Sequence, residues 1–244
     1  MLLNVSSIRK CDLMASDGVI GKCKDFLFDD GQWTIRYMVA DTARWLPGRK
    51  VLISPLSLGS PLWPDQLPVN LTKEQIKESP PLDEDAPVSR EYEIRWADHY
   101  QYPYYWPHGD LWGIRHYGPA VPSAHASERI EDAQGTNLRS AKEVTGYHIE
   151  ARDGGIGHVE DFIVDDTMWS IRYLVIDTRN WLPGRKVLVA APWVDHIRWA
   201  DETVHVTMDK EQIENSPPYD PKQPVNLGYE ARLYDYYGRP VARL

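Results

Sequence analysis

The chain carries one long motif twice. Asp17–Leu52 aligns without a gap with Asp153–Leu188, 136 positions later, and 23 of the 36 aligned residues are identical. Two unrelated segments of ordinary composition would share far fewer residues, so we infer a tandem duplication. In a chain of 244 residues, each copy then has to bury a modest core of its own. The repeat also separates residues that both copies share from residues that only one copy has.

The shared motif predicts a hairpin of two strands followed by a third strand. Residues 20–28 and 32–39 are expected to be the paired strands, and Asp29-Asp30-Gly31 between them is typical of a tight turn. Leu46–Arg49 contains the Pro-Gly pair of a type II turn, and Lys50–Ile53 is expected to be the next strand. Period-two alternation places four residues of the second strand on one face in each copy: Trp33, Ile35, Tyr37 and Val39, and then Trp169, Ile171, Tyr173 and Val175.

A short helix is predicted near the end of each copy. Thr72 can cap a helix together with Gln75 three residues later, and Asp209 takes the capping position in the second copy. Ser-Pro-Pro at 79–81 and again at 216–218 is expected to end these helices, because proline cannot continue one.

The duplication continues beyond these helices into an aromatic tail. Pro87–Tyr100 and Pro224–Tyr237 share Tyr, Glu, Arg and Asp residues at matching positions. We expect each tail to be an extended arm that docks its Tyr, Trp and Arg residues onto a barrel, either its own or that of the other copy. Residues 101–135 have no counterpart; we expect the aromatic first half to pack against protein and Ser123–Gly135 to be a mobile linker.

Together these elements predict a mainly β fold. We expect two tandem small antiparallel β-barrels, each with a short helix and an extended C-terminal arm. The predicted domains are residues 1–100 and 138–244, with residues 101–137 as the linker between them.

The repeated stretches resemble a known family. Gly18–Phe26 and Gly154–Phe162, the Trp-x-Ile-Arg-Tyr strand and the Leu-Pro-Gly-Arg-Lys-Val-Leu corner are similar to the PRC-barrel superfamily, over residues 5–78 and 141–215. The superfamily is named for the cytoplasmic domain of the photosynthetic reaction-centre H subunit and includes the C-terminal domain of a ribosome maturation factor. The double copy with its Tyr-rich tail is similar to stand-alone bacterial PRC-barrel proteins of unassigned activity. The resemblance implies an adaptor barrel that contacts other proteins and has no catalytic constellation.

Charge and cysteine usage limit the partners and the compartment. The net charge of -9 argues against a nucleic-acid module, because phosphate neutralisation by a basic surface supplies most of such affinity. The sequence has no secretory signal at its start and no window near the roughly 18 apolar residues of a membrane span, so we expect a cytoplasmic protein. Cys11 and Cys23 correspond to Tyr147 and Val159 in the second copy, which excludes a duplicated disulfide or zinc site. We expect both cysteines to be small apolar core residues of a protein in a reducing compartment.

Neither the carboxylates nor the histidines form a repeated reaction centre. Asp29 and Asp30 are expected to be turn residues, and Asp25 is expected to form an ion pair with a nearby cation such as Arg36. None of the eight histidines recurs at an equivalent position. Asp195-His196 could be a fragment of a hydrolytic triad, but no nucleophile elbow accompanies it. We therefore expect no enzymatic activity, no catalytic residues, no cofactor and no metal site.

The candidate interface consists of repeated residues that neither a tight turn nor a strand requires. They are Trp45, Arg49, Trp181 and Arg185 at the two corners, and Tyr92, Arg95, Tyr229 and Arg232 in the two arms. The sequence thus predicts a non-enzymatic scaffold or adaptor for an unknown protein partner. We expect its barrels to pair as an internal pseudodimer, and a homo-oligomer is compatible with this. The alternative is a regulatory protein with a small-ligand or metal site between the barrels.

Overall fold

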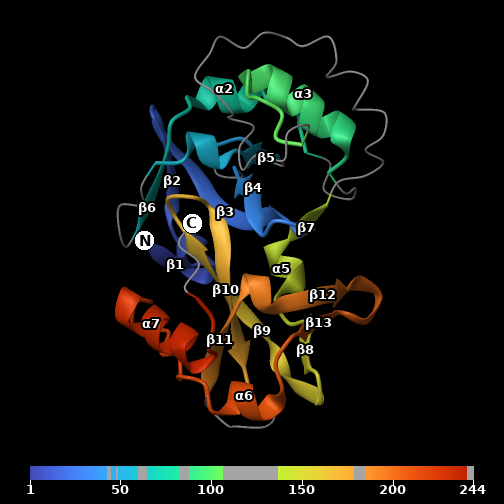
Figure 1. Ribbon diagram of the computed structural model, residues 1–244. Coiled ribbons are helices and arrows are strands. Elements are labelled where there is room, and N and C mark those ends of the chain that lie inside the picture. Colours follow the sequence, from blue (N-terminus) through green and yellow to red (C-terminus); the bar gives the residue numbers. More distant parts are fainter. Residues whose placement is uncertain are drawn as a thin grey trace. The chain divides into compact units, whose positions relative to one another are not determined.

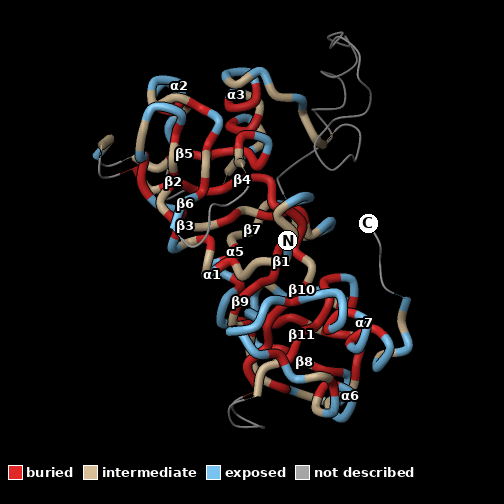
Figure 2. Tube along the Cα trace, turned by 90° about the vertical axis from the view of Figure 1, so that its left-hand side faces the viewer, coloured by how far each residue is buried: buried red, intermediate tan, exposed pale blue. Residues whose placement is uncertain are grey.

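The computed structural model describes residues 1–42, 45–47, 49–59, 65–82, 88–106, 137–178 and 185–240 (Figure 1). The chain is mainly β and divides into two compact units. The first-repeat unit is Cys11–Leu138, and the second-repeat unit is Met1–Lys10 together with Arg139–Leu244. In both units the buried residues gather along the strands, as Figure 2 shows.

The first-repeat unit is built on five strands in the order β6-β2-β3-β4-β5. Neighbouring strands are antiparallel except for β2 and β6, which are parallel. The elements are β2 (Asp12–Ala15), β3 (Gly18–Asp29), β4 (Thr34–Asp41), β5 (Lys50–Ile53), the 3-10 helix η1 (Pro55–Ser57), β6 (Gln66–Val69), α2 (Lys73–Glu78) and α3 (Arg90–Tyr100).

The second-repeat unit repeats this arrangement with the order β12-β13-β8-β9-β10-β11, in which β8 and β13 are parallel. A further strand, β1 (Leu2–Asn4), pairs with β9. The remaining elements are α1 (Val5–Ile8), β7 (Leu138–Ser140, which begins in the first-repeat unit), α5 (Ala141–Val144), β8 (His148–Ala151), β9 (Gly154–Asp165), β10 (Ser170–Asp177), β11 (Lys186–Ala190), η2 (Ala191–Trp193), β12 (Val194–Arg198), η3 (Trp199–Asp201), β13 (Thr203–Val206), α6 (Lys210–Glu214) and α7 (Leu227–Tyr236).

Each unit includes the peptide that precedes the other copy in the sequence. In the second-repeat unit, the Met1 carbonyl accepts a hydrogen bond from the Asp166 amide at 3.0 Å. In the first-repeat unit, the Asn137 carbonyl accepts the equivalent bond from the Asp30 amide at 3.1 Å. Met1–Lys10 therefore lies outside the unit in which the expected domain 1–100 had placed it.

The predicted strands are present, but barrel closure is not confirmed. β3, β4 and β5 match the three strands expected in the first copy. The strand pairings described for each unit form an open series with one parallel neighbour pair, so the expectation of purely antiparallel barrels is corrected. β2 and β6 are joined by a long connection, which can cross over and bring two strands together in parallel.

The tails after the short helices are themselves helices, so the prediction of extended arms is wrong. The Ser89 side chain caps α3 by accepting from the Tyr92 amide, and the Asn226 side chain caps α7 by accepting from the Tyr229 amide. Both helices bury a stripe with helical spacing, which in α3 is Tyr92, Glu93, Trp96 and Ala97. The expected short helices α2 and α6 are confirmed, each with a capping box.

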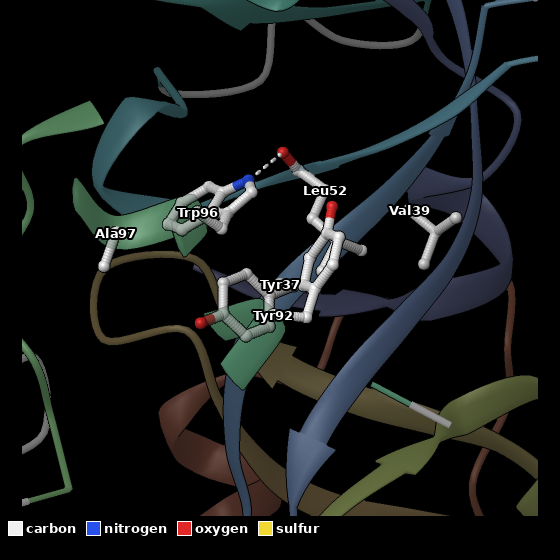
Figure 3. Close-up of a cluster of buried hydrophobic side chains, with 6 residues drawn as sticks. All are labelled: Tyr37, Val39, Leu52, Tyr92, Trp96 and Ala97. Atoms are coloured by element: carbon white, nitrogen blue, oxygen red, sulfur yellow. Dashed lines mark hydrogen bonds between the residues drawn. The ribbon is translucent and has the colours of Figure 1, made fainter. Parts of the chain in front are cut away.

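Helix α3 packs on the sheet of its own unit. Trp96 and Tyr92 lie against Tyr37, Val39 and Leu52 of β4 and β5 in one buried cluster (Figure 3). The Trp96 indole N–H donates to the Leu52 carbonyl at 3.0 Å. This fixes the helix over the strand that carries Arg36, which positions the site described below.

Both copies need glycine at one close approach of strands. Gly21 and Gly157 have φ of 138° and 142°. A Cβ atom at these positions would lie 1.9 Å from the Asp41 carbonyl oxygen and 2.1 Å from that of Asp177. No other residue fits there, which explains why this glycine is repeated. Among the helices of the described chain, none combines the length and the apolar character needed to cross a membrane.

Candidate functional site

The first-repeat unit buries a carboxylate beside two arginines. The Glu93 side chain on α3 is fully buried and accepts a hydrogen bond from the Tyr37 hydroxyl of β4 at 3.0 Å. Arg90 Nη1 donates to its other oxygen at 2.7 Å. Arg36, next to Tyr37 on β4, is only 3% exposed, and its guanidinium lies 3.6 Å from Asp29 and donates to Gln32 at 2.7 Å. We call Arg36, Tyr37 and Glu93 the Arg-Tyr-Glu floor.

A segment of the chain after α3 covers this floor. Gln101 has a φ of 56°, which ends the helix in the left-handed conformation and turns the chain back. Tyr102–Trp106, which we call the covering peptide, then passes over the site. The Tyr105 hydroxyl donates to Glu93 at 2.7 Å, and its ring centre lies 4.0 Å from the Arg36 guanidinium. The Trp106 ring lies 4.2 Å from the Arg90 guanidinium. Both are cation-π contacts that shield charge from water.

Desolvation dominates the electrostatics of the site. Burial raises the pKa of Glu93, although Arg90 and the two tyrosine hydroxyls favour its ionised form. Burial also lowers the pKa of the Arg36 guanidinium and raises the pKa of Tyr105. Three hydrogen-bond donors thus converge on one carboxylate that is shielded from water, which is an arrangement suited to holding a peptide in one geometry.

A small pocket lies next to the covering peptide. A pocket of about 20 Å³ remains between Arg36, Trp96, Tyr102 and Tyr105. Room for one water needs roughly 10–15 Å³, so this pocket admits water but no metabolite.

The second-repeat unit has the same floor. The Tyr173 hydroxyl of β10 donates to Glu230 of α7 at 2.6 Å. Arg172, the equivalent of Arg36, is partly exposed, and Leu227 replaces Arg90 with 82% of its surface exposed. Burial raises the pKa of Tyr173, as expected for a hydroxyl held against a carboxylate in the core.

The two units fill the neighbouring aromatic layer with different residues. In the first-repeat unit, Tyr102 packs 5.6 Å from Trp96, and its hydroxyl is hydrogen-bonded to Ser57. In the second-repeat unit the residue equivalent to Ser57 is Trp193, which packs 5.3 Å from Tyr234. Arg239, which takes the position of Tyr102 when the spacing of the two tails is continued past α7, has its guanidinium 5.2 Å from the centre of the Trp193 ring. Trp193 therefore supplies from the sheet side the bulk that Tyr102 supplies from the covering peptide.

The corner residues predicted as interface make intramolecular contacts. The Trp45 indole N–H donates to the Ile20 carbonyl at 2.9 Å. Arg49 donates to the carbonyl of Lys77 in the last turn of α2, at 2.5 Å, and to the carbonyl of Ser79, which ends this helix. Arg185 likewise donates to the Ser216 carbonyl after α6. Trp181 lies outside the described residues.

The arm residues divide into buried and exposed pairs. The Tyr92 hydroxyl donates to the Pro80 carbonyl at 2.9 Å, and the Tyr229 hydroxyl to the Pro217 carbonyl at 3.0 Å. Arg95 and Arg232 are exposed on α3 and α7. Of the eight candidates, these two arginines are therefore the described ones that face solvent.

The aspartates of the shared motif act as turn and cap residues. Asp29 accepts from the Gly31 and Gln32 amides, which confirms the predicted turn. Asp161 accepts from the Ser6 amide at 3.1 Å and so caps α1. Asp25 accepts from the Phe26 amide, and the ion pair seen at Arg36 is with Asp29.

The histidines and cysteines add no repeated chemistry. His196 is hydrogen-bonded to Asp195 at 2.9 Å, and its ring stacks on His205 with centroids 4.3 Å apart. The described residues include no group of three His, Cys, Asp or Glu side chains placed to hold a metal. Cys11 and Cys23 are buried, as expected, and neither is in a disulfide.

This site was not predicted from the sequence. Arg36 was expected only to pair with an aspartate, and Glu93 and Tyr105 had no expected role of their own. The available signal was the pairing of a repeated Arg-Tyr dipeptide with a repeated Tyr-Glu dipeptide, at Arg36-Tyr37 with Tyr92-Glu93 and at Arg172-Tyr173 with Tyr229-Glu230. A comparison with protein-family models finds none that matches the chain. A comparison with curated proteins finds no significant match either.

Proposed function

We propose that this protein is a non-enzymatic cytoplasmic adaptor that acts through protein-protein contacts. The observation that carries the proposal is the covering peptide: the first-repeat unit already holds an aromatic segment by a buried carboxylate and two arginines. A tyrosine hydroxyl on a buried acceptor and aromatic rings on guanidinium groups are contacts typical of protein interfaces.

We further propose that the two units are PRC-barrel-like domains paired as an internal pseudodimer. In the second-repeat unit, the two ends of the series β11-β10-β9-β8-β13-β12 are consecutive in the chain, since η2 alone separates β11 from β12. This continuity supports a barrel-like unit. The inclusion of Met1–Lys10 in the second-repeat unit supports a pairing of the copies, because segments exchanged between copies are a common route to dimers.

Site-specific cross-linking in the native cell tests the adaptor function. A photoreactive residue at Arg95 or Arg232, the two exposed candidates, is expected to capture the same partner in stoichiometric amount. The control is Lys24, which is exposed on β3. A yield at Arg95 and Arg232 no higher than that at Lys24 contradicts the proposal.

Two further measurements test the pairing and the ligand alternative. After cleavage between residues 123 and 135, the halves are expected to stay associated at micromolar concentration, and free separation contradicts the pseudodimer. Native mass spectrometry is expected to give the bare chain mass. A stoichiometric extra mass would instead favour the ligand-binding or metal-binding regulator.

A further inference from the structure

The second-repeat unit has the Arg-Tyr-Glu floor, but its sequence has no equivalent of the aromatic cover. No similarity extends past the two tails, but when their spacing of 137 positions is continued, Tyr104–Pro107 correspond to Val241–Leu244, and none of these four is aromatic or carries a hydroxyl group. The chain therefore has no tyrosine at the position that would repeat the contact of Tyr105 with Glu93.

The surface above this floor has an exposed apolar side chain next to a carboxylate that can accept further hydrogen bonds, and a bound peptide would supply contacts to both. Leu227 is 82% exposed at the first turn of α7, where a leucine gains nothing from facing water. Within the described chain, Glu230 has one hydrogen-bond donor, the Tyr173 hydroxyl, whereas Glu93 has three. Glu230 is nevertheless largely buried, and a carboxylate in such a place benefits from every further donor.

We propose that this surface binds a peptide of another protein that carries a tyrosine followed by a large apolar residue. The tyrosine hydroxyl donates to Glu230, and its ring lies on the Arg172 guanidinium, as Tyr105 does with Glu93 and Arg36. The next residue packs on Leu227. Because leucine stands in place of Arg90, the contact made by Trp106 is replaced here by an apolar one. This inference rests on the proposed adaptor function and names its partner class.

The chain supplies its own probe for the test. A capped synthetic peptide, Tyr-Pro-Tyr-Tyr-Trp-Pro, has the sequence of residues 102–107. Titrated calorimetrically into the full chain, it is expected to bind with one peptide per chain. Replacing its third tyrosine, the equivalent of Tyr105, by phenylalanine removes the hydroxyl for Glu230 and is expected to weaken binding by about threefold to tenfold.

Two variants on the same helix locate the binding surface. Leu227→Asp, at a highly exposed position that tolerates substitution, is expected to weaken binding by about tenfold or more. Asp235→Lys changes the charge at another exposed position on α7 and is expected to change binding by less than about twofold. The inference is overturned by no binding at about 1 mM peptide, or by equal effects of the two variants.

The outcomes separate this inference from the adaptor function. If the peptide does not bind but cross-linking at Arg95 and Arg232 captures a partner, this inference is wrong and the adaptor function stands. If the peptide binds as described but no partner is captured at Arg95 or Arg232, the binding surface stands and the adaptor proposal loses its support.

Discussion

The two units differ most where their sequences stop repeating. Both build the same floor from a strand arginine, a strand tyrosine and a helix glutamate. The first-repeat unit then covers this floor with Tyr105 and Trp106, while the second-repeat unit presents Leu227 and a partly exposed Arg172. The repeated residues build the frame in both units, and residues that one copy alone has, such as Tyr105 and Leu227, make the two units differ above it.

The largest effect is expected where both copies depend on the same glycine. Gly21→Ala and Gly157→Ala each drive a Cβ into a carbonyl oxygen at a positive φ and should lower the free energy of unfolding by about 4 kcal/mol or more. Gly146→Ala is the control: its φ is 105° with no atom within 4 Å, so about 1–2 kcal/mol is expected. Urea denaturation measures all three, and similar losses for all of them would show that the close approach does not matter.

A second substitution tests which unit contains the N-terminal segment. Ile8 is fully buried in α1, which packs on β9 of the second-repeat unit. Ile8→Ala should cost about 3 kcal/mol through the cavity it leaves. Hydrogen exchange should then quicken in β9, whereas Ile20→Ala, equally buried in β3, should affect the first-repeat unit. If amide hydrogen exchange became faster only in β3 of the Ile8 variant, Met1–Lys10 would belong to the first-repeat unit, which would contradict its placement in the second-repeat unit.

The tyrosine of the floor should matter more in the second-repeat unit. Tyr173→Phe removes the one donor that the described residues offer to Glu230, whereas after Tyr37→Phe two donors to Glu93 remain. We expect a loss of about 2 kcal/mol for Tyr173→Phe and about 1 kcal/mol for Tyr37→Phe in urea denaturation. A larger loss for Tyr37→Phe than for Tyr173→Phe would mean that the hydrogen bond from the covering peptide to Glu93 does not stabilise the carboxylate.

A smaller effect concerns pH. Burial raises the pKa of Glu93 above its ordinary value of 4.5. Between that value and its raised pKa, the folded chain holds a proton that the unfolded chain has released, so the contribution of Glu93 to stability falls as the pH rises. Glu93→Gln cannot titrate and should flatten the decline of the unfolding free energy above pH 4.5. Parallel pH profiles of the variant and the natural chain would contradict this assignment.

The sequence predicted the frame because the frame is encoded locally. Turn chemistry at Asp29–Gly31, the capping box at Thr72 and the β-strand over Lys50–Ile53 all depend on near neighbours and were confirmed. The predicted extended arm was wrong, because its helical stripe contains Glu93, a residue that is buried only when tertiary partners satisfy it.

The site escaped prediction because its parts are distant in sequence. Arg36, Glu93 and Tyr105 meet only after α3 packs on β4 and the chain reverses at Gln101. Gln101 is neither glycine nor asparagine, so its left-handed conformation gives no signal in the sequence. The exchange of the N-terminal segments likewise depends on long-range pairing that no local pattern contains.

We propose that the surface which the covering peptide occupies in the first-repeat unit is open to a peptide of another protein in the second-repeat unit. The double variant Tyr105→Ala, Trp106→Ala removes the cover, and calorimetric titration with the peptide of residues 102–107 counts the available surfaces directly. We predict two peptides bound per chain for this variant against one for the natural chain, and the binding retained by the second-repeat unit shows that the variant is folded. An unchanged count of one, or no binding in either chain, would contradict the account.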